Sequence, residues 1–580
     1  MVLPAAMMNV SLLSALLCCS AATILLLKWR GRRKGQGKRE GAKQRRERAL
    51  EQMDKAVRRF KGQNPGHQPA PILSLTLPEL CGNLRDGSVS PESALYTYMD
   101  KALQVTRDVN CITDYLEDSE AQLLHVKTQG KKGLLYGVPI SIKDSIDCKG
   151  RDSTLGLVKR LCKPAAADAV VVQVLKQQGA VPFVKTNVPQ SLLNYDCSNL
   201  IFGQTVHPLD HTKTPGGSSG GEGALIKSGG SILGIGTDVG GSVRIPAAFC
   251  GICGLKTTGN RISKKGIIPS IRGQKSAVAG VGPMARDVDS LALCLRALLC
   301  DEMYRLDPTV PPIPFNEEVY SSSRPLRIGY YATDSFTMPG PSMRRAVMET
   351  KQLLEKAGHS LVPFKPCRME YFMCSITPRG LFADGCATFL ESFKGESEDP
   401  KLKDLLFMAK LPNWFRSLLS WIFKPISPRI SKSLISMKER SVQELWKFHS
   451  ETEEYIQEFI AEWKKLDLDV MLCPALGPAC KIGFPGRLSV GSSYTILYNY
   501  LDFPAGVVPV TTVTEEDEEE LKSYRGHYND MWDKVFVEAM KEAVGLPVAV
   551  QCVALPWQDE LCLRFMKEVE KLTRDKQREL

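Results

Sequence analysis

Two serines in a glycine-rich stretch have the surroundings that a hydroxyl nucleophile needs. Ser218 and Ser242 each follow a Gly-Gly pair, in residues 214–226 and 233–246. Glycine lets the backbone turn tightly and brings its N–H groups close to a ligand. A hydroxyl nucleophile, a group that moves its proton and backbone donors for an oxyanion make an acyl-transfer site. The alternative is a pair of flexible Gly/Ser loops, but the flanking apolar residues indicate turns anchored in a core.

A lysine upstream could serve as the base. Residues 136–142 predict a buried strand from Val138, Ile140 and Ile142, and Lys143 follows where this strand should end. A serine hydroxyl is almost un-ionised at neutral pH, so a base must take its proton. A lysine can do so only when it is neutral, which requires burial or a neighbouring cation to lower its pKa from about 10.4.

Taken together, these motifs resemble those of the amidase signature family. The family hallmark is Gly-Gly-Ser-Ser-Gly-Gly, then Asp-x-Gly-Gly-Ser-x-Arg-x-Pro, with a lysine upstream after a Gly-Val-Pro strand. Here they are residues 216–221, 238–246 and 137–143, and the resemblance runs from about residue 134 to the C-terminus. It implies that Ser242 is the nucleophile and Lys143 the base. It also implies that Ser218 bridges them and is joined to its neighbour by a cis peptide bond.

The same resemblance assigns supporting roles to other residues. The oxyanion hole would be formed by the N–H groups of Val239, Gly240, Gly241 and Ser242. Ser219, Asp238 and Arg244 would hold the loop. Leu193, Phe382 and Met437 would line an apolar acyl channel, although mammalian members place aromatic residues where this chain has Leu193 and Ser433. No metal ion and no cofactor is expected.

Two other interpretations remain to be tested. Residues 216–220 also satisfy the Gly-x-Ser-x-Gly nucleophile elbow, which would make Ser218 the nucleophile of an α/β-hydrolase. That elbow needs an apolar strand before it, and residues 207–215 cannot form one. A membrane-anchored scaffold without activity would have a damaged site, whereas every motif position here is intact. Within the family, the competitor is an amidase for polar substrates, such as a glutamine-dependent amidotransferase.

The net charge of +11 does not indicate a nucleic-acid partner. Residues 28–62 contain 15 Lys/Arg and 4 Asp/Glu, so the rest of the chain is balanced. The 18 cysteines lack disulfide-framework spacing and favour reduced, mostly buried thiols. Cys250 and Cys253 have the spacing of a redox or metal pair, but no second pair or histidine lies nearby.

The N-terminus predicts a membrane anchor. Residues 2–27 are uncharged and mostly apolar, and about 20 such residues span a bilayer. A basic run follows them, which disfavours a signal peptide and places the body of the protein in the cytosol. We therefore predict a transmembrane anchor at 1–29, a basic, helical region at 30–95 that either lies on anionic lipid or is solvated, and a catalytic domain at 96–580.

A second apolar segment lies at 401–440. Aromatic and apolar residues alternate there with basic ones in pieces too short to span a bilayer, which is typical of interfacial membrane helices. The alternative is a pair of ordinary core helices. Both membrane-directed segments favour a lipid substrate over a polar one. The resemblance implies hydrolysis of long-chain fatty acid amides to a fatty acid and an amine, at the endoplasmic reticulum membrane, by a homodimer.

The remaining pattern predicts an α/β fold. Short apolar strands alternate with helices from about residue 134 onward. Such alternation indicates a mixed, twisted β-sheet covered by helices on both faces, the fold that the resemblance also implies.

Overall fold

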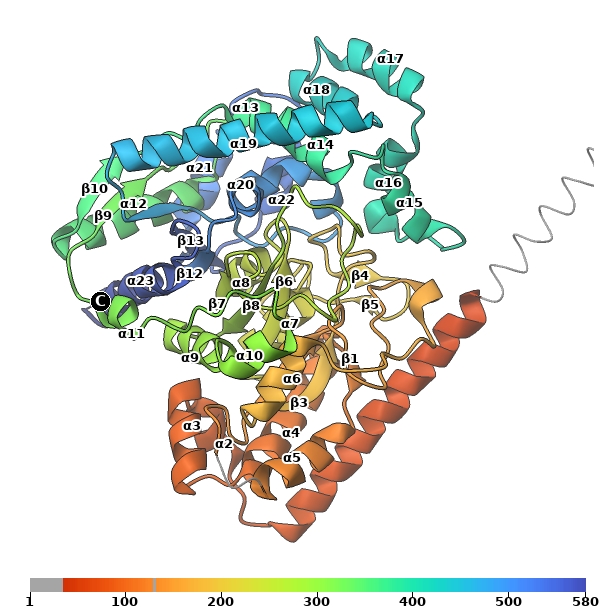
Figure 1. Ribbon diagram of the computed structural model, residues 1–580, viewed down its shortest axis with the longest axis vertical. Helices are drawn as coiled ribbons and strands as arrows, with labels where there is room; N and C mark the ends of the chain where they lie inside the picture. The colour runs from red at the N-terminus through yellow and green to blue at the C-terminus, as the bar shows by residue number, and fades with distance from the viewer. Residues whose placement is uncertain (1–34, 129–131, 580) are drawn as a thin grey trace, which may run out of the picture.

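One large mixed sheet forms the centre of the computed structural model, which describes residues 35–128 and 132–579 (Figure 1). Its eleven strands follow the order β1-β3-β2-β6-β8-β7-β12-β13-β11-β9-β10. Parallel pairs such as β2–β6 occur beside antiparallel pairs such as β6–β8. In chain order the strands are β1 (Ile112–Tyr115), β2 (Pro139–Lys143), β3 (Val181–Thr186), β6 (Leu233–Asp238), β7 (Cys253–Lys256), β8 (Gly280–Ala285), β9 (Arg327–Tyr330), β10 (Ser360–Pro363), β11 (Val470–Pro474), β12 (Ala505–Thr512) and β13 (Pro547–Val553).

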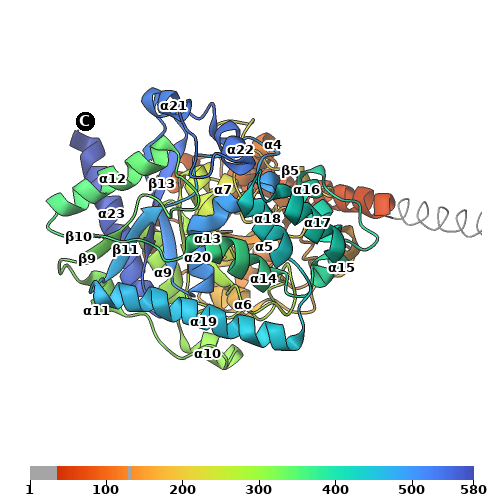
Figure 2. The same ribbon diagram turned by 90° about the horizontal axis from the view of Figure 1, so that it is seen from above.

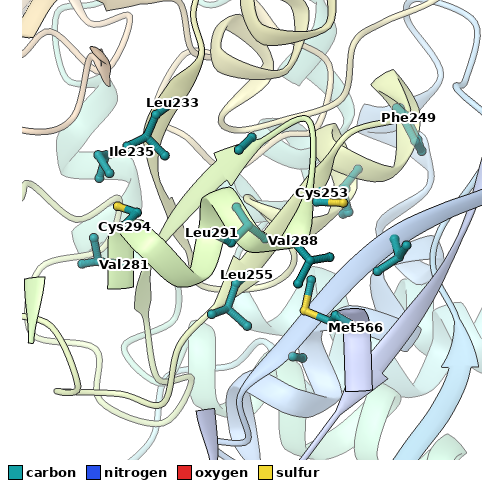
Figure 3. Close-up of a cluster of buried hydrophobic side chains, with 14 of the residues drawn as sticks. Leu233, Ile235, Phe249, Cys253, Leu255, Val281, Val288, Leu291, Cys294 and Met566 are labelled. Atoms are coloured by element: carbon teal, nitrogen blue, oxygen red, sulfur yellow. The ribbon is translucent and has the colours of Figure 1, made fainter. Parts of the chain in front are cut away.

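Helices cover both faces of this sheet, as the sequence predicts. Successive strand residues point to opposite faces. Met284 of β8 joins the small apolar cluster that contains residues of α7 (Gly220–Lys227) and α8 (Arg244–Cys250). Its neighbour Ala285 joins the main core. There, α9 (Val288–Leu298) and α23 (Asp559–Glu579) contribute Leu291 and Met566 to the same cluster as strand residues (Figure 3).

The N-terminal part of the described chain packs against this body. An α-helix covers residues 35–63, as expected for the basic segment, and buries Met53, Val57 and Phe60. It is followed by α2 (Pro69–Ser74), α3 (Leu77–Asp86) and α4 (Pro91–Val109), and the side chain of Ser90 caps α4. Residues 64–68 join the helix at 35–63 to α2, which begins at Pro69.

The apolar segment at 401–440 folds into three short helices at one end of the molecule (Figure 1). They are α16 (Lys403–Lys410), α17 (Asn413–Phe423) and α18 (Pro428–Ser436). The long helix α19 (Val442–Lys465) follows them. Within residues 35–128 and 132–579, no helix combines the length and apolarity that crossing a bilayer requires. The anchor expected at 1–29 lies outside the described residues.

Candidate active site

The candidate base and the first serine meet at one edge of the sheet. Lys143 is the last residue of β2, and Thr237 lies near the end of the parallel neighbour β6. The carboxyl ends of adjacent parallel strands share an edge, which is where ligands bind in α/β sheets. Lys143 Nζ lies 2.8 Å from Ser218 Oγ, 2.9 Å from Thr237 Oγ1 and 3.1 Å from the Thr237 carbonyl oxygen.

Burial sets the protonation of this lysine. The Lys143 side chain is fully buried, and burial lowers its pKa from 10.5 to about 7, against the opposing effect of Asp238 and other acidic groups nearby. Within the described part of the chain, no carboxylate forms an ion pair with its amino group. Near neutral pH a substantial fraction of Lys143 is therefore the free amine, the form that accepts a proton.

The two glycine-serine turns pack directly against each other. The peptide bond between Gly217 and Ser218 is cis, as the sequence resemblance implies. The N–H of Ser219 donates to the carbonyl oxygen of Ser242 at 3.1 Å. A β-carbon on Gly216, whose φ is +84°, would come within 2.8 Å of the Pro246 backbone. Glycine is required here because any side chain would push the turns apart.

Ser242 itself is half-buried at the start of α8. Among the described residues, its hydroxyl has no hydrogen-bond partner, so the structure brings Lys143 and Ser218 into contact but shows no bond from Ser218 to Ser242. The four predicted oxyanion donors do not have equal roles. The Gly241 N–H donates to Asp238 Oδ1 at 2.7 Å, which leaves the N–H groups of Val239, Gly240 and Ser242 for a ligand.

Asp238 and Arg244 hold the Ser242 turn, as the sequence resemblance implies. Both side chains are fully buried, and Arg244 donates to both carboxylate oxygens of Asp238, at 2.9 and 3.0 Å. Burial by itself raises the pKa of Asp238, but Arg244 and the Val243 N–H more than offset it, so this pKa lies below its usual value. Arg244 also donates to Gln551, Asn499 and the Thr495 carbonyl oxygen. The turn is thus fixed by a satisfied charge network.

The three predicted channel residues come together in one apolar cluster. Phe382 and Met437 are buried in it, and Leu193 packs against its edge. They arrive from distant parts of the chain, and Met437 follows α18 directly. We call this set the acyl cluster; its other buried members are Leu155, Leu157, Val188, Leu192, Ile271, Cys386, Phe389, Phe393, Leu402, Leu406 and Ala409.

Two site residues are not predicted from the sequence. Thr237 contacts Lys143 through both its hydroxyl and its carbonyl oxygen. Glu222 is fully buried behind β2, where it accepts hydrogen bonds from Ser141 and Thr186, and burial raises its pKa to about 7. Both residues could have been found from their places beside the Gly-rich motifs. Thr237 directly precedes Asp238, and Glu222 directly follows the Gly-Gly-Ser-Ser-Gly-Gly run.

The nucleophile elbow finds no support. Residues 205–219 form no strand before Ser218, and the partner of the Ser218 hydroxyl is Lys143 rather than a histidine. The Cys250–Cys253 pair is buried, and burial raises the pKa of both thiols, so neither is a reactive thiolate. The cysteines of the described residues are all free and mostly buried, as expected.

Comparisons with known proteins agree with this architecture. The family model described as Amidase matches residues 93–563. Fatty-acid amide hydrolase 1 of Sus scrofa is 57% identical over 558 residues, 96% of each chain. The Vitamin D3 hydroxylase-associated protein of Gallus gallus is 58% identical over 439 residues, 76% of this chain and 95% of the relative. A solved structure titled Fatty acid amide hydrolase superposes with a TM-score of 0.77 at 25% identity, covering 93% of this chain and 95% of that one.

The motif residues that the structure gathers at the carboxyl ends of its strands agree with three similarities. These are the matched family model, two relatives above 50% identity and the shared fold. This chain is an enzyme of the amidase family, a hydrolase that acts on amide bonds.

Proposed function

We propose that this enzyme hydrolyses long-chain fatty acid amides at a membrane surface, with Ser242, Ser218 and Lys143 as a catalytic triad. The curated relative that covers 96% of the chain is named a fatty-acid amide hydrolase, which supports the substrate class. The acyl cluster, which gathers Leu193, Phe382 and Met437, offers an apolar wall for an alkyl chain.

The contacts of Lys143 carry the proposal for the base. A neutral lysine amine has two N–H groups and one lone pair. Thr237 offers two oxygens that accept those N–H groups, and the lone pair is then left for the Ser218 O–H. A charged ammonium in the same place would donate to Ser218 Oγ as well, and would have no lone pair and no carboxylate partner. Burial, which lowers the pKa of Lys143 to about 7, is what supports the neutral form.

The reaction follows from this arrangement. Ser242 Oγ attacks the amide carbon while its proton passes to Ser218, whose own proton moves to Lys143. The N–H groups of Val239, Gly240 and Ser242 receive the oxyanion. Ser218, reprotonated from Lys143, gives its proton to the nitrogen as the C–N bond breaks and the amine leaves. Water then attacks the acyl-enzyme by the same proton path, which releases a fatty acid and restores Ser242.

Helix α17 supports the proposal of a membrane surface, because it exposes apolar side chains and buries polar ones, the reverse of a helix on a water-exposed surface. Trp414 and Trp421 are 69% and 74% exposed, whereas the polar residues Arg416 and Ser420 of the same helix are buried. Exposed tryptophans beside basic residues are typical of an interfacial helix. Ordinary core helices would bury these rings instead.

The position of α17 agrees with that of the N-terminal helix. The N-terminal end of the helix at 35–63, drawn in red, lies on the same side of the molecule as α15 (Ala387–Phe393), α16 and α17 in both views (Figures 1 and 2). An anchor at residues 1–29 and the α17 surface could thus contact one bilayer, with the body in the cytosol. A lipid amide would then reach the acyl cluster, which includes Leu406 of α16, without crossing water.

Turnover of paired substrates tests the proposal. The full chain in detergent should hydrolyse a long-chain acyl ethanolamide at least about 100-fold faster, in kcat/KM, than a short polar amide, since each buried methylene contributes about 0.8 kcal/mol. The Ser242→Ala variant is the control for contaminating activity. Equal turnover of both amides would contradict the lipid substrate and favour an amidase for polar substrates.

A further inference from the structure

A cavity of about 420 Å³ lies beside the acyl cluster and is not used by the proposed reaction. Its volume is within the range of small-molecule sites. Leu155 and Leu157 form part of its wall and also belong to the acyl cluster, so the cavity and the cluster share one apolar side. Lys143, Ser218 and Ser242 do not line it.

Most of the remaining wall is cationic or hydroxylic, beside the apolar residues Ile267, Ile268 and Pro269. Of the twelve residues that line the cavity, Lys159, Arg160 and Arg272 are cationic and none is acidic. Ser191, Thr388 and Ser392 add hydroxyl groups. A space with one apolar side and one positive, hydrogen-bonding side matches a ligand with an alkyl chain and an anionic head.

Acidic residues lie close behind this wall and offset part of its charge, but none of them lines the cavity. Glu396 accepts from the N–H groups of Val158 and Lys159. Asp144 accepts from those of Thr154 and Leu155, and Asp152 from those of Cys162 and Lys163. These carboxylates fix the loop that presents the cations. Glu391 also lies near Lys159, and Asp147 near Arg160.

The three cations are only partly engaged by the protein. Lys159 Nζ donates to the Glu391 carbonyl oxygen at 2.6 Å, and Arg160 Nε donates to the Ser153 carbonyl oxygen at 2.8 Å. Within residues 35–128 and 132–579, Arg272 forms neither a hydrogen bond nor an ion pair. Burial lowers the pKa of both Lys159 and Arg160, against the opposing effect of Glu396 and Glu391 on Lys159 and of Asp147, Asp144 and Asp152 on Arg160.

The cavity wall is also continuous with the membrane-directed side of the molecule. Val158 and Leu161 pack with Ala42 of the N-terminal helix 35–63. Arg45 of that helix lies 3.5 Å from Asp152, which holds the same loop. An amphiphile that leaves the acyl cluster would therefore find the cationic wall near the side that we place at the bilayer.

We propose that this cavity is a second lipid site, which binds the carboxylate of a long-chain fatty acid while the alkyl chain follows the shared leucine wall into the acyl cluster. This inference rests on the proposed function, which makes a fatty acid the product. A neutral amide has no charge for Lys159, Arg160 and Arg272 to attract. The carboxylate of a fatty acid is negatively charged and is attracted by all three. The site thus distinguishes product from substrate by charge.

Direct binding tests this site without turnover. The full chain carrying Ser242→Ala is placed in phosphatidylcholine nanodiscs and titrated with the fluorescent fatty acid cis-parinaric acid, with empty nanodiscs as background. We expect Arg272→Gln combined with Lys159→Gln to weaken binding of the acid about tenfold. The methyl ester, which lacks the charge, should bind all variants within about twofold.

A matched control removes the same charge outside the cavity. Lys275→Gln with Lys163→Gln changes two cations in the same loops that do not line the wall, and should leave binding of the acid unchanged. The single variant Arg272→Gln, at an exposed position, serves if the double variant does not fold. The proposal is overturned if acid binding survives the double substitution, or if acid and ester weaken together.

The anionic head could instead come from a phospholipid, and a further arm separates the two sources. Adding phosphatidylserine to the nanodiscs should affect acid binding equally in the parent and in Arg272→Gln/Lys159→Gln if the site takes fatty acid. If phosphatidylserine weakens acid binding in the parent but not in the double variant, the fatty acid assignment is overturned in favour of the phospholipid headgroup. Because the protein carries Ser242→Ala, failure of amide hydrolysis and failure of acid binding are measured separately.

Discussion

The Lys143 amino group and the Ser218 hydroxyl lie 2.8 Å apart, at the edge where two parallel strands end. This contact joins a buried amine to a turn that contains the chain's cis Gly217–Ser218 bond. Thr237 accepts two further hydrogen bonds from the same amino group, through its hydroxyl and its carbonyl oxygen.

The nucleophile can be identified by covalent labelling. A serine-directed fluorophosphonate should label Ser242, because this serine sits in the turn with the free backbone donors. Ser242→Ala should lower kcat by about 1,000-fold or more and leave the urea midpoint of unfolding unchanged, since the side chain is half-buried and unbonded. Peptide mapping that places the label on Ser218 would refute this assignment.

The pH–rate profile should report the Lys143 base. Its pKa is lowered to about 7, and only the neutral amine accepts a proton, so activity rises with pH through that value. We expect kcat/KM to increase about tenfold per pH unit well below pH 7 and to level off above about pH 8. Lys143→Glu should shift the rising limb to lower pH. A parent rate that is flat between about pH 5 and 9 would contradict a lysine base.

Removing Arg244 should destabilise the fold as well as the site. Arg244→Met leaves the fully buried Asp238 carboxylate without its partner, which typically costs about 3–5 kcal/mol. Urea unfolding of the two proteins at pH 7 measures this loss. Arg296→Met is the matched control, since its partner Glu317 is 59% exposed, and should cost less than about 1 kcal/mol. Equal losses in both variants would contradict the network.

Chain-length preference should depend on Leu193. Leu193→Phe adds volume at the edge of the acyl cluster beside Phe382 and Met437, and overpacking a filled apolar site costs about 1–3 kcal/mol. We expect kcat/KM for an 18-carbon amide to fall about tenfold relative to an 8-carbon amide. Leu209→Phe, at a 55% exposed position, is the control and should leave the ratio unchanged. Parallel loss for both amides would show that Leu193 does not contact the chain.

The α17 surface should hold the protein to a bilayer without the N-terminal anchor. A chain lacking residues 1–29 should still sediment with liposomes, since several exposed apolar side chains can together contribute several kcal/mol. Trp414→Glu with Trp421→Glu should release it while fluorophosphonate labelling persists. Leu124→Glu is the control and should leave liposome binding unchanged. Leu124 is 64% exposed on α5 (Asp118–Thr128), which lies at the opposite end of the molecule in Figure 1. A truncated parent that stays monodisperse without detergent would contradict the membrane surface.

The sequence by itself determined the family and the class of fold, and it predicted the candidate catalytic residues. Short-range sequence patterns were sufficient for features that depend on neighbouring residues: the alternation of strands and helices, and the strand that ends at Lys143. The Gly-Gly-Ser turns were predictable because only glycine permits the approach of Gly216 to Pro246.

Only the tertiary structure decided which groups meet and in what state. The pKa of Lys143 depends on burial by distant segments, so no local pattern contains it. Sequence motifs could not show that Gly241 donates to Asp238 or that Glu222 lies behind β2, because both are contacts of the folded backbone. Likewise, the composition of α17 fits a core helix or a surface one. In the folded protein Arg416 and Ser420 pack inward, and Trp414 and Trp421 therefore face outward. This packing decides which face the helix exposes.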